Sequence, residues 1–171
     1  MIVVREETPG EILSIKAVIL AAFGRRSEAL LVDALRAHAC DFVSLVVLDC
    51  GELVANAVLT PVTVDGASSV RGLGIGPVSV APEHQGRGIG TALVRHAIRR
   101  SMRGDFAFAV VSGAPDYYAR FGFKPAAAFG LSDELCAEAG DFQAIEFAHG
   151  ALRGCPGIVR YVPEFSLVTE D

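Results

Sequence analysis

Several features that would place the chain in a common functional class are missing from its sequence. The four cysteines form no C-x-x-C pair and have no zinc-ligand spacing with histidine, so we expect no metal site and free, buried thiols at Cys40, Cys50, Cys136 and Cys155. No apolar run approaches the length of a membrane span, and the charged beginning of the sequence is too short in apolar length for a signal peptide. We therefore expect a cytoplasmic protein without a membrane partner.

A surplus of basic residues is also missing. The 171 residues include 15 Lys and Arg against 20 Asp and Glu, and the formal net charge of −5 argues against a nucleic-acid partner and mildly favours cationic small molecules. With 51% hydrophobic and 20% charged residues, the composition is that of a globular protein, and the length suits one domain spanning residues 1–171. Monomer and homodimer both remain open.

Two familiar phosphate-binding loops are absent. A Walker loop ends in Gly-Lys-Ser or Gly-Lys-Thr, and neither tripeptide occurs. Gly72, Gly74 and Gly76 are spaced G-x-G-x-G, but they lie before or within a predicted strand, whereas a Rossmann fingerprint needs G-x-G-x-x-G at the strand-to-helix turn. Any phosphate site must therefore use another glycine-rich turn.

Such a turn occurs in residues 73–93, which predict a strand, a loop and the start of a helix. Val78 and Val80 alternate with smaller or polar residues as in a strand, and Pro82 ends the ladder because it has no amide hydrogen. The segment QGRGIGT follows at 85–91, and a helical apolar pattern begins at Ile89. Glycines at a helix start leave backbone N–H groups pointing outward, and with Arg87 they predict a site for two adjacent phosphates of a nucleotide cofactor.

Two motifs in this region resemble those of the GCN5-related N-acetyltransferases (GNAT family). Gln85, Gly88 and Gly90 occupy the fixed positions of Q/R-x-x-G-x-G/A. Tyr118, Gly122 and Phe123 match the Y-x-x-x-G-F segment. The order of the motifs agrees with the family, and the segment YYARFGF is similar to the YhbS-like subgroup of predicted bacterial acetyltransferases.

This resemblance implies a fold and a cofactor. The fold is a single-domain α/β (α+β) structure, with a mixed, mostly antiparallel central sheet flanked by helices and a splayed strand pair that forms an acyl-CoA cleft. Acetyl-CoA would be the co-substrate, with no metal. Its pantetheine would pair with the central strand and its pyrophosphate with the glycine-rich turn. The expected cofactor-binding residues are Val78, Ser79, Val80, Gln85, Gly86, Arg87, Gly88, Ile89, Gly90 and Thr91.

The resemblance also implies direct attack of an amine on the thioester. Tyr118 is the candidate proton donor to the departing thiolate, and a packing aromatic is its alternative role. No general base is identifiable, and the acceptor amine remains open between a small molecule and a protein. An acyl-CoA sensor without turnover is the alternative function. A cysteine-nucleophile enzyme is disfavoured because no cysteine lies beside a base motif.

Other patterns predict the remaining elements. The second predicted helix should bury Leu30, Leu31, Ala34 and Leu35 and leave Asp33, Arg36 and His38 in solvent, and Pro61 should mark an edge or a distortion of its strand. The predicted elements are a strand over 2–4, a helix from the capping box at 8–11, a second helix capped by Ser27, a hairpin over 42–64, a helix over 88–102, a strand over 106–111, a short helix from Pro115, a short helical or irregular stretch beginning at 132–134, and strands over 142–147 and 158–161. If the strand over 106–111 runs parallel to the central strand, a helical crossover joins the two.

Overall fold

The computed structural model describes residues 1–135 and 140–168, which form two compact units. The first comprises Met1–Leu59, Gly76–Ala97 and the described part of Pro163–Asp171; the second comprises Thr60–Ile75 and the described part of Ile98–Val162. β3 (Glu52–Val64), β4 (Arg71–Val80) and α3 (Ile89–Met102) contribute residues to both units. None of the helices in the described ranges is both long and apolar enough to cross a membrane. The expectation of one domain over 1–171 stays a prediction.

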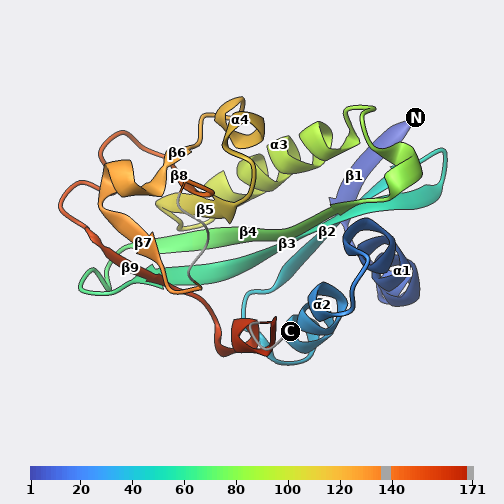
Figure 1. The fold of residues 1–171 in the computed structure, drawn as a ribbon, viewed down its shortest axis with the longest axis horizontal. Helices are drawn as coiled ribbons and strands as arrows, with labels where there is room; N and C mark the ends of the chain where they lie inside the picture. Colours follow the sequence, from blue (N-terminus) through green and yellow to red (C-terminus); the bar gives the residue numbers. More distant parts are fainter. Residues whose placement is uncertain (136–139, 169–171) are drawn as a thin grey trace. The chain divides into compact units, whose positions relative to one another are not determined.

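The first unit contains the antiparallel strands β1 (Ile2–Glu6), β2 (Val43–Asp49) and β3, and the end of β4 lies beside β3 in the same sheet. β1 pairs with β2, and β2 pairs with β3 as the predicted hairpin (Figure 1). Cys50 and Gly51 connect β2 to β3 with positive φ values of 51° and 88°, the conformation that tight hairpins require. Ser44–Val47 of β2 and Val54–Thr60 of β3 are buried without alternation, so both faces of these two strands are covered.

Two helices, α1 (Ile12–Phe23) and α2 (Ser27–His38), pack against each other in the first unit (Figure 1). Ile15, Val18 and Ile19 form the buried side of α1. On α2 the prediction was partly wrong, because Leu30 is 55% exposed and Ala29, Leu31, Val32 and Leu35 form the buried stripe. Ser27 is the first helical residue rather than the cap, and its buried hydroxyl donates to the Glu28 carboxylate.

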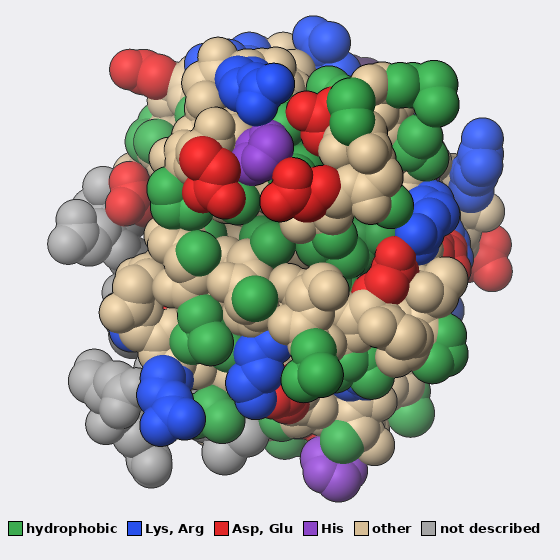
Figure 2. Space-filling model, turned by 90° about the vertical axis from the view of Figure 1, so that its right-hand side faces the viewer, with side chains coloured by type: hydrophobic (Ala, Val, Ile, Leu, Met, Phe, Trp, Pro, Cys, Tyr) green, Lys and Arg blue, Asp and Glu red, His purple; other side chains and the backbone are tan. Residues whose placement is uncertain are grey.

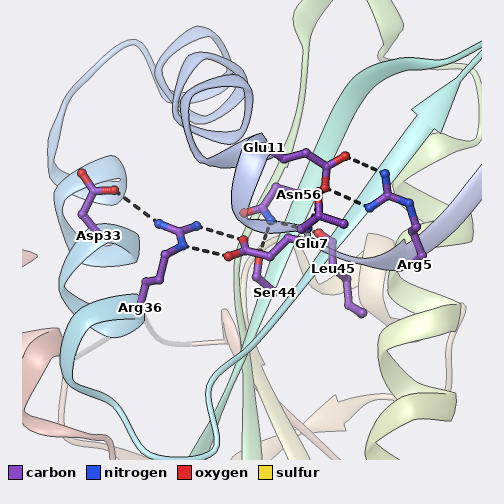
Figure 3. Close-up of polar contacts among 9 residues, drawn as sticks. Arg5, Glu7, Glu11, Asp33, Arg36, Ser44, Leu45 and Asn56 are labelled. Carbon is purple, nitrogen blue, oxygen red and sulfur yellow. Dashed lines mark hydrogen bonds and ion pairs between the residues drawn. The ribbon is translucent and has the colours of Figure 1, made fainter.

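A chain of charges links the end of β1 to α1 and α2, and it corrects the expectation that Arg36 is solvated. The Arg36 guanidinium donates to both carboxylate oxygens of Glu7 at 2.8 and 2.9 Å and lies 3.4 Å from Asp33 (Figure 3). Lys16 on α1 donates to Asp33 at 2.7 Å. Arg36 and Glu7 are largely buried, so the pair joins elements far apart in sequence rather than covering a solvated face.

The predicted capping box at 8–11 forms over the short 3₁₀ helix η1 (Pro9–Glu11), and it carries a pH-dependent contribution to stability. The Glu11 carboxylate accepts hydrogen bonds from the Arg5 guanidinium and from the Thr8 backbone N–H, and the Arg5 bond lowers its pKa from 4.5 to about 2. Because the pKa is lower in the folded state, this stabilisation is present above pH 4.5 and is lost as the pH falls towards 2. We expect Glu11→Gln to lower the free energy of unfolding in urea by about 1 kcal/mol at neutral pH and to have little effect near pH 2. An equal loss at both pH values would contradict this origin.

The second unit is built on a mixed sheet. β4 pairs in parallel with β5 (Phe108–Ser112) from Gly72–Phe108 to Gly74–Val110, and β5 pairs antiparallel with β8 (Phe142–Glu146) (Figure 1). β4 and β5 are parallel, and α3 is the helical crossover that we expected for that case. β8 also pairs with β6 (Lys124–Pro125), and β9 (Gly157–Arg160) pairs with the end of β3 and with β7 (Leu131–Asp133). The mixed, mostly antiparallel fold class is therefore confirmed, while the splayed cleft stays a prediction.

Two local predictions have clear outcomes in the second unit. β3 pairs with β2 up to Leu59 and with β9 from Thr63, and Pro61 lies between these two pairings. Its missing N–H therefore falls where the partner strand changes. The stretch expected to begin at 132–134 as a helical or irregular segment is a strand at Ser132 and Asp133, where pairing with β9 outweighs the local capping preference, and Glu134 follows in a turn; residues 136–139 lie outside the described residues. Besides η1, the described residues form the short 3₁₀ helices η2 (Pro82–His84), η3 (Ala126–Phe129) and η4 (Pro163–Val168).

The cysteine prediction was wrong about burial. Cys40 and Cys50 are exposed, Cys155 is partly exposed, and all three are free thiols. Cys136 lies outside the described residues. Turns and loops carry the three described cysteines, and these positions have no core to fill.

Candidate functional site

The glycine-rich turn lies in the first unit, between the end of β4 and the start of α3. The Ala81 N–H donates to the carbonyl oxygen of Val54, and η2 follows at once, so the strand ends at the predicted Pro82. The Gln85 side-chain amide donates to the carbonyl oxygen of Val80 at 3.0 Å. The first residue of the motif therefore fastens the turn to the last residue of β4.

Backbone N–H groups of the turn are available to an external acceptor. Gly86 and Gly88 have φ values of +71° and +81°, and a Cβ at either position would meet no atom within 4 Å. The first amide of the helix start that donates within the protein is that of Ala92, to the Gly88 carbonyl oxygen at 3.0 Å. In the described chain the amides of residues 86–91 have no protein acceptor. A run of such donors at the positive end of a fourteen-residue helix is suited to bind a diphosphate.

Arg87 lies in a network of mixed charge beside this turn. Its guanidinium is 3.6 Å from the Asp49 carboxylate and 3.2 Å from His84 Nδ1, and His84 is itself 4.0 Å from both Asp49 and Glu52. Figure 2 shows acidic, basic and histidine side chains close together near the top of the face that it draws. The Arg87 side chain is 56% exposed and its ion pair with Asp49 is 3.6 Å long. Rotation of the guanidinium towards a phosphate would therefore cost little free energy.

Ser79, the middle residue of the predicted pantetheine-binding stretch, has a buried side chain. Its hydroxyl donates to the backbone carbonyl of Asn56 at 3.3 Å. The Asn56 amide donates in turn to the Ser44 hydroxyl at 2.8 Å and to the Leu45 carbonyl at 2.9 Å (Figure 3). These hydrogen bonds tie β4 to β3 and β2, and they were not predicted from the sequence; the signal was one asparagine within the otherwise apolar run Leu53–Leu59. Ser79 can therefore offer a ligand its backbone rather than its hydroxyl.

A groove of about 370 Å³ in the first unit is unsuited to phosphate. It is lined by small and apolar residues of α1 and the start of β3, and its charged residues are Glu52 and Glu83. Both carboxylates would repel a diphosphate, whereas the amides of residues 86–91 would attract one. The turn is therefore better suited to a diphosphate than the groove is.

Tyr118 lies in the second unit on the short helix α4 (Pro115–Ala119), as predicted. Its side chain is 8% exposed, and its ring packs edge-on against Tyr117 and Phe123 at centroid distances of 5.0 and 5.9 Å. A Cβ at Gly113 would lie 2.7 Å from the ring, so this glycine makes room for it. Burial, with a smaller contribution from Tyr117, raises the pKa of Tyr118 to about 12, so the phenol keeps its proton at physiological pH. Gly122 adopts the predicted left-handed exit at φ +98°.

Comparison with known proteins decides the family. The model of the GNAT acetyltransferase domain matches residues 3–126, which is most of the chain. The chain belongs to the GNAT acetyltransferase family. The match confirms the resemblance that the two motifs indicated. The chain is therefore a member of a family of N-acetyltransferases.

Relatives of this GNAT protein cover nearly its whole length. It is 30% identical over 164 residues to the uncharacterised N-acetyltransferase YhbS of Escherichia coli K12, which covers 95% of this chain and 98% of the relative. The crystal structure of E. coli YhbS in complex with CoA superposes with a TM-score of 0.88 at 29% identity, covering 96% and 92% of the two chains. A GNAT acetyltransferase from Brucella melitensis in complex with acetyl-CoA has a TM-score of 0.79 at 32% identity, covering 96% and 98%.

The structure of this GNAT protein separates the expected site residues by unit. The first unit holds Val78–Val80 together with the turn of residues 85–91, and the second holds Tyr118. Within 1–135 and 140–168, no three or more His, Cys, Asp and Glu side chains are grouped as metal ligands would be. The roles of the individual residues remain predictions.

Proposed function

We propose that this GNAT protein transfers an acetyl group from acetyl-CoA to a primary amine by direct attack within a ternary complex. One observation carries the proposal: the amides of residues 86–91 have no acceptor in the described chain and lie at the start of α3. A protein that leaves such donors unpaired needs a ligand or solvent to satisfy them, and the pyrophosphate of CoA is an anion of the right kind.

The remaining cofactor contacts follow from the position of this turn after β4. The backbone of Val78, Ser79 and Val80 would hydrogen-bond the pantetheine amides, since the Ser79 side chain is already used within the protein. Gln85 would hold the turn in place, and Gly86, Arg87, Gly88, Ile89, Gly90 and Thr91 would surround the pyrophosphate. The complexes of E. coli YhbS with CoA and of the Brucella enzyme with acetyl-CoA support this assignment.

The reaction needs an unprotonated amine and a stabilised leaving group. The amine nitrogen forms the new bond to the thioester carbon, the carbon–sulfur bond breaks, and the sulfur leaves as a thiolate that finally takes up a proton. The nitrogen loses one proton, so the proton count balances. We assign the donor facing the sulfur to Tyr118, whose phenol remains protonated because burial raises its pKa to about 12.

The raised pKa restricts what Tyr118 can do. Complete proton transfer from a phenol of pKa about 12 to a thiolate whose thiol has a pKa of about 8.5 is uphill by roughly 5 kcal/mol. Hydrogen-bond donation to the developing thiolate carries no such cost and still stabilises the transition state. In this proposal Tyr118 therefore acts as a hydrogen-bond donor, and the proton that reaches the sulfur comes ultimately from the amine through solvent.

Thiol release tests the proposal. Acetyl-CoA should bind with one molecule per chain, and a panel of polyamines, aminoglycosides, amino acids and peptide N-termini should contain acceptors that release free CoA in amounts equal to the acetylated product. Binding of acetyl-CoA with no thiol released across the panel would support the sensor function instead. Absence of binding would contradict both.

A further inference from the structure

The groove of about 370 Å³ lies wholly within the first unit, and one of its walls is a face of α1. Ser14, Ala17, Val18 and Ala21 follow one another at spacings of three and four residues, so they lie on the same side of the helix. None of these side chains is larger than that of valine. The face of α1 is therefore too thin to fill the space beside it.

The other wall is formed where β3 begins and β4 ends. Leu53 and Val54 of β3 line it together with Ala81, whose N–H donates to the Val54 carbonyl oxygen at 2.9 Å. Both walls are therefore mainly apolar. The volume of the groove lies within the range of sites for small organic molecules, roughly 300–1,000 Å³. Its size and lining suit a ligand with an alkyl part.

The lining of the groove carries two carboxylates and no basic side chain. Glu83 is exposed, and its carboxylate has no hydrogen bond or ion pair with the described chain. The Glu52 side chain is 71% exposed, and its contact with a basic group is to His84 Nε2 at 4.0 Å. Arg87 lies beside His84, but it is 3.6 Å from the Asp49 carboxylate, whose charge it balances. The groove therefore presents uncompensated negative charge to an occupant.

Apolar walls beside negative charge select the class of ligand. They favour an organic cation and disfavour phosphates and other anions. A metal ion is disfavoured as well, because within 1–135 and 140–168 the two carboxylates belong to no group of three or more side chains that could hold one. We propose that this groove binds a primary ammonium carried on a short alkyl chain. The ammonium faces Glu52 and Glu83, and the chain lies between Ala17 and Val54.

A matched pair of probes tests this proposal on the protein without acetyl-CoA. Hexylammonium and 1-hexanol share the same alkyl chain, and only the amine is charged at neutral pH. We expect hexylammonium to bind about threefold or more tightly than hexanol, because it adds the contact with the carboxylates, and we expect hexanoate not to bind. Titrations followed in ¹⁵N–¹H spectra should move the signals of residues 14–21 and 52–54 furthest. Added salt should weaken the binding of hexylammonium and leave that of hexanol nearly unchanged.

Two variants test whether the probes bind in the groove. Glu83→Gln removes an exposed charge and should lower the affinity for hexylammonium by about threefold or more without affecting hexanol. Ala17→Leu fills the groove from an exposed helix position and should lower the affinity for both probes by roughly tenfold or more. Asp105→Asn removes an exposed carboxylate outside the lining and should change neither affinity. Circular dichroism checks that each variant is folded.

Three results would overturn the proposal. Equal affinities for hexylammonium and hexanol would show that the groove does not recognise charge. Hexylammonium binding that Ala17→Leu and Glu83→Gln leave unchanged would place the cation elsewhere. Loss of binding in Ala17→Leu with wild-type affinity in Glu83→Gln would assign the groove to a neutral ligand. Because acetyl-CoA is absent, none of these results depends on the acetyl transfer proposed above.

Discussion

Gly88→Glu is expected to abolish acetyl-CoA binding in a folded protein. Its side chain would enter space that is open in the structure, beside amides 86–91, and would place a carboxylate where the diphosphate is proposed to lie. Two unit charges about 4 Å apart near a protein surface repel by about 4 kcal/mol, which corresponds to a loss of affinity of roughly a thousandfold. Calorimetric titration with acetyl-CoA measures the affinity, and circular dichroism checks that the variant is folded.

A second glycine provides the matched control. Gly66, in the turn between β3 and β4, has a φ of +82° against +81° at Gly88, and its Cβ position is equally open. Gly66→Glu therefore introduces the same charge with the same backbone strain but away from the proposed phosphate site. It should bind acetyl-CoA as the wild type does. Unchanged affinity in folded Gly88→Glu, or equal losses in both variants, would contradict the assignment.

Tyr118→Phe is expected to lower kcat by roughly 10²-fold or more and to leave acetyl-CoA affinity within about twofold. The substitution keeps the ring that packs against Tyr117 and Phe123 and removes only the hydroxyl, so the fold should be retained. Burial raises the pKa of this phenol from 10 to about 12, so the phenol stays protonated up to a higher pH than an ordinary tyrosine does. The wild-type rate should therefore not fall near pH 10 through ionisation of Tyr118. Steady-state kinetics with the best acceptor of the panel, as a function of pH, measures both expectations.

Tyr117→Phe is the control for this experiment. Its ring carries the Arg120 guanidinium at 4.7 Å and contacts Phe121, a packing role that phenylalanine can fill. This variant should retain nearly the wild-type kcat. A wild-type rate in Tyr118→Phe, under conditions where the chemical step limits turnover, would show that Tyr118 is a packing residue only.

Local chemistry explains why the phosphate turn could be predicted from the sequence. Pro82 must end a ladder, Gly86 and Gly88 can take positive φ values, and Ile89 starts a helical pattern, so strand, turn and helix follow from residues close together in the chain. The short helix at Pro115 and the left-handed exit at Gly122 follow for the same reason. The family motif lies on these same residues.

Long-range pairing explains what could not be predicted. Tyr161 lies over Gly74 of β4 and interacts with Ser112 of β5 and Asp133 of β7, and no local pattern marks residues so distant in sequence. Ser132 and Asp133 are residues typical of a helix start, yet pairing with β9 places them in a strand. Arg36 has the spacing of a solvated helix position, and only the fold brings Glu7 beside it.

Amide spectra of the isotope-labelled protein test the central claim most directly. Titration with CoA should move the ¹⁵N–¹H signals of residues 86–91 furthest and slow their hydrogen exchange, because each gains an acceptor that it lacks in the described chain. The amide of Ala92, already bonded to Gly88, provides the internal reference. Saturation of the protein by CoA with the signals of residues 86–91 unmoved would contradict the account.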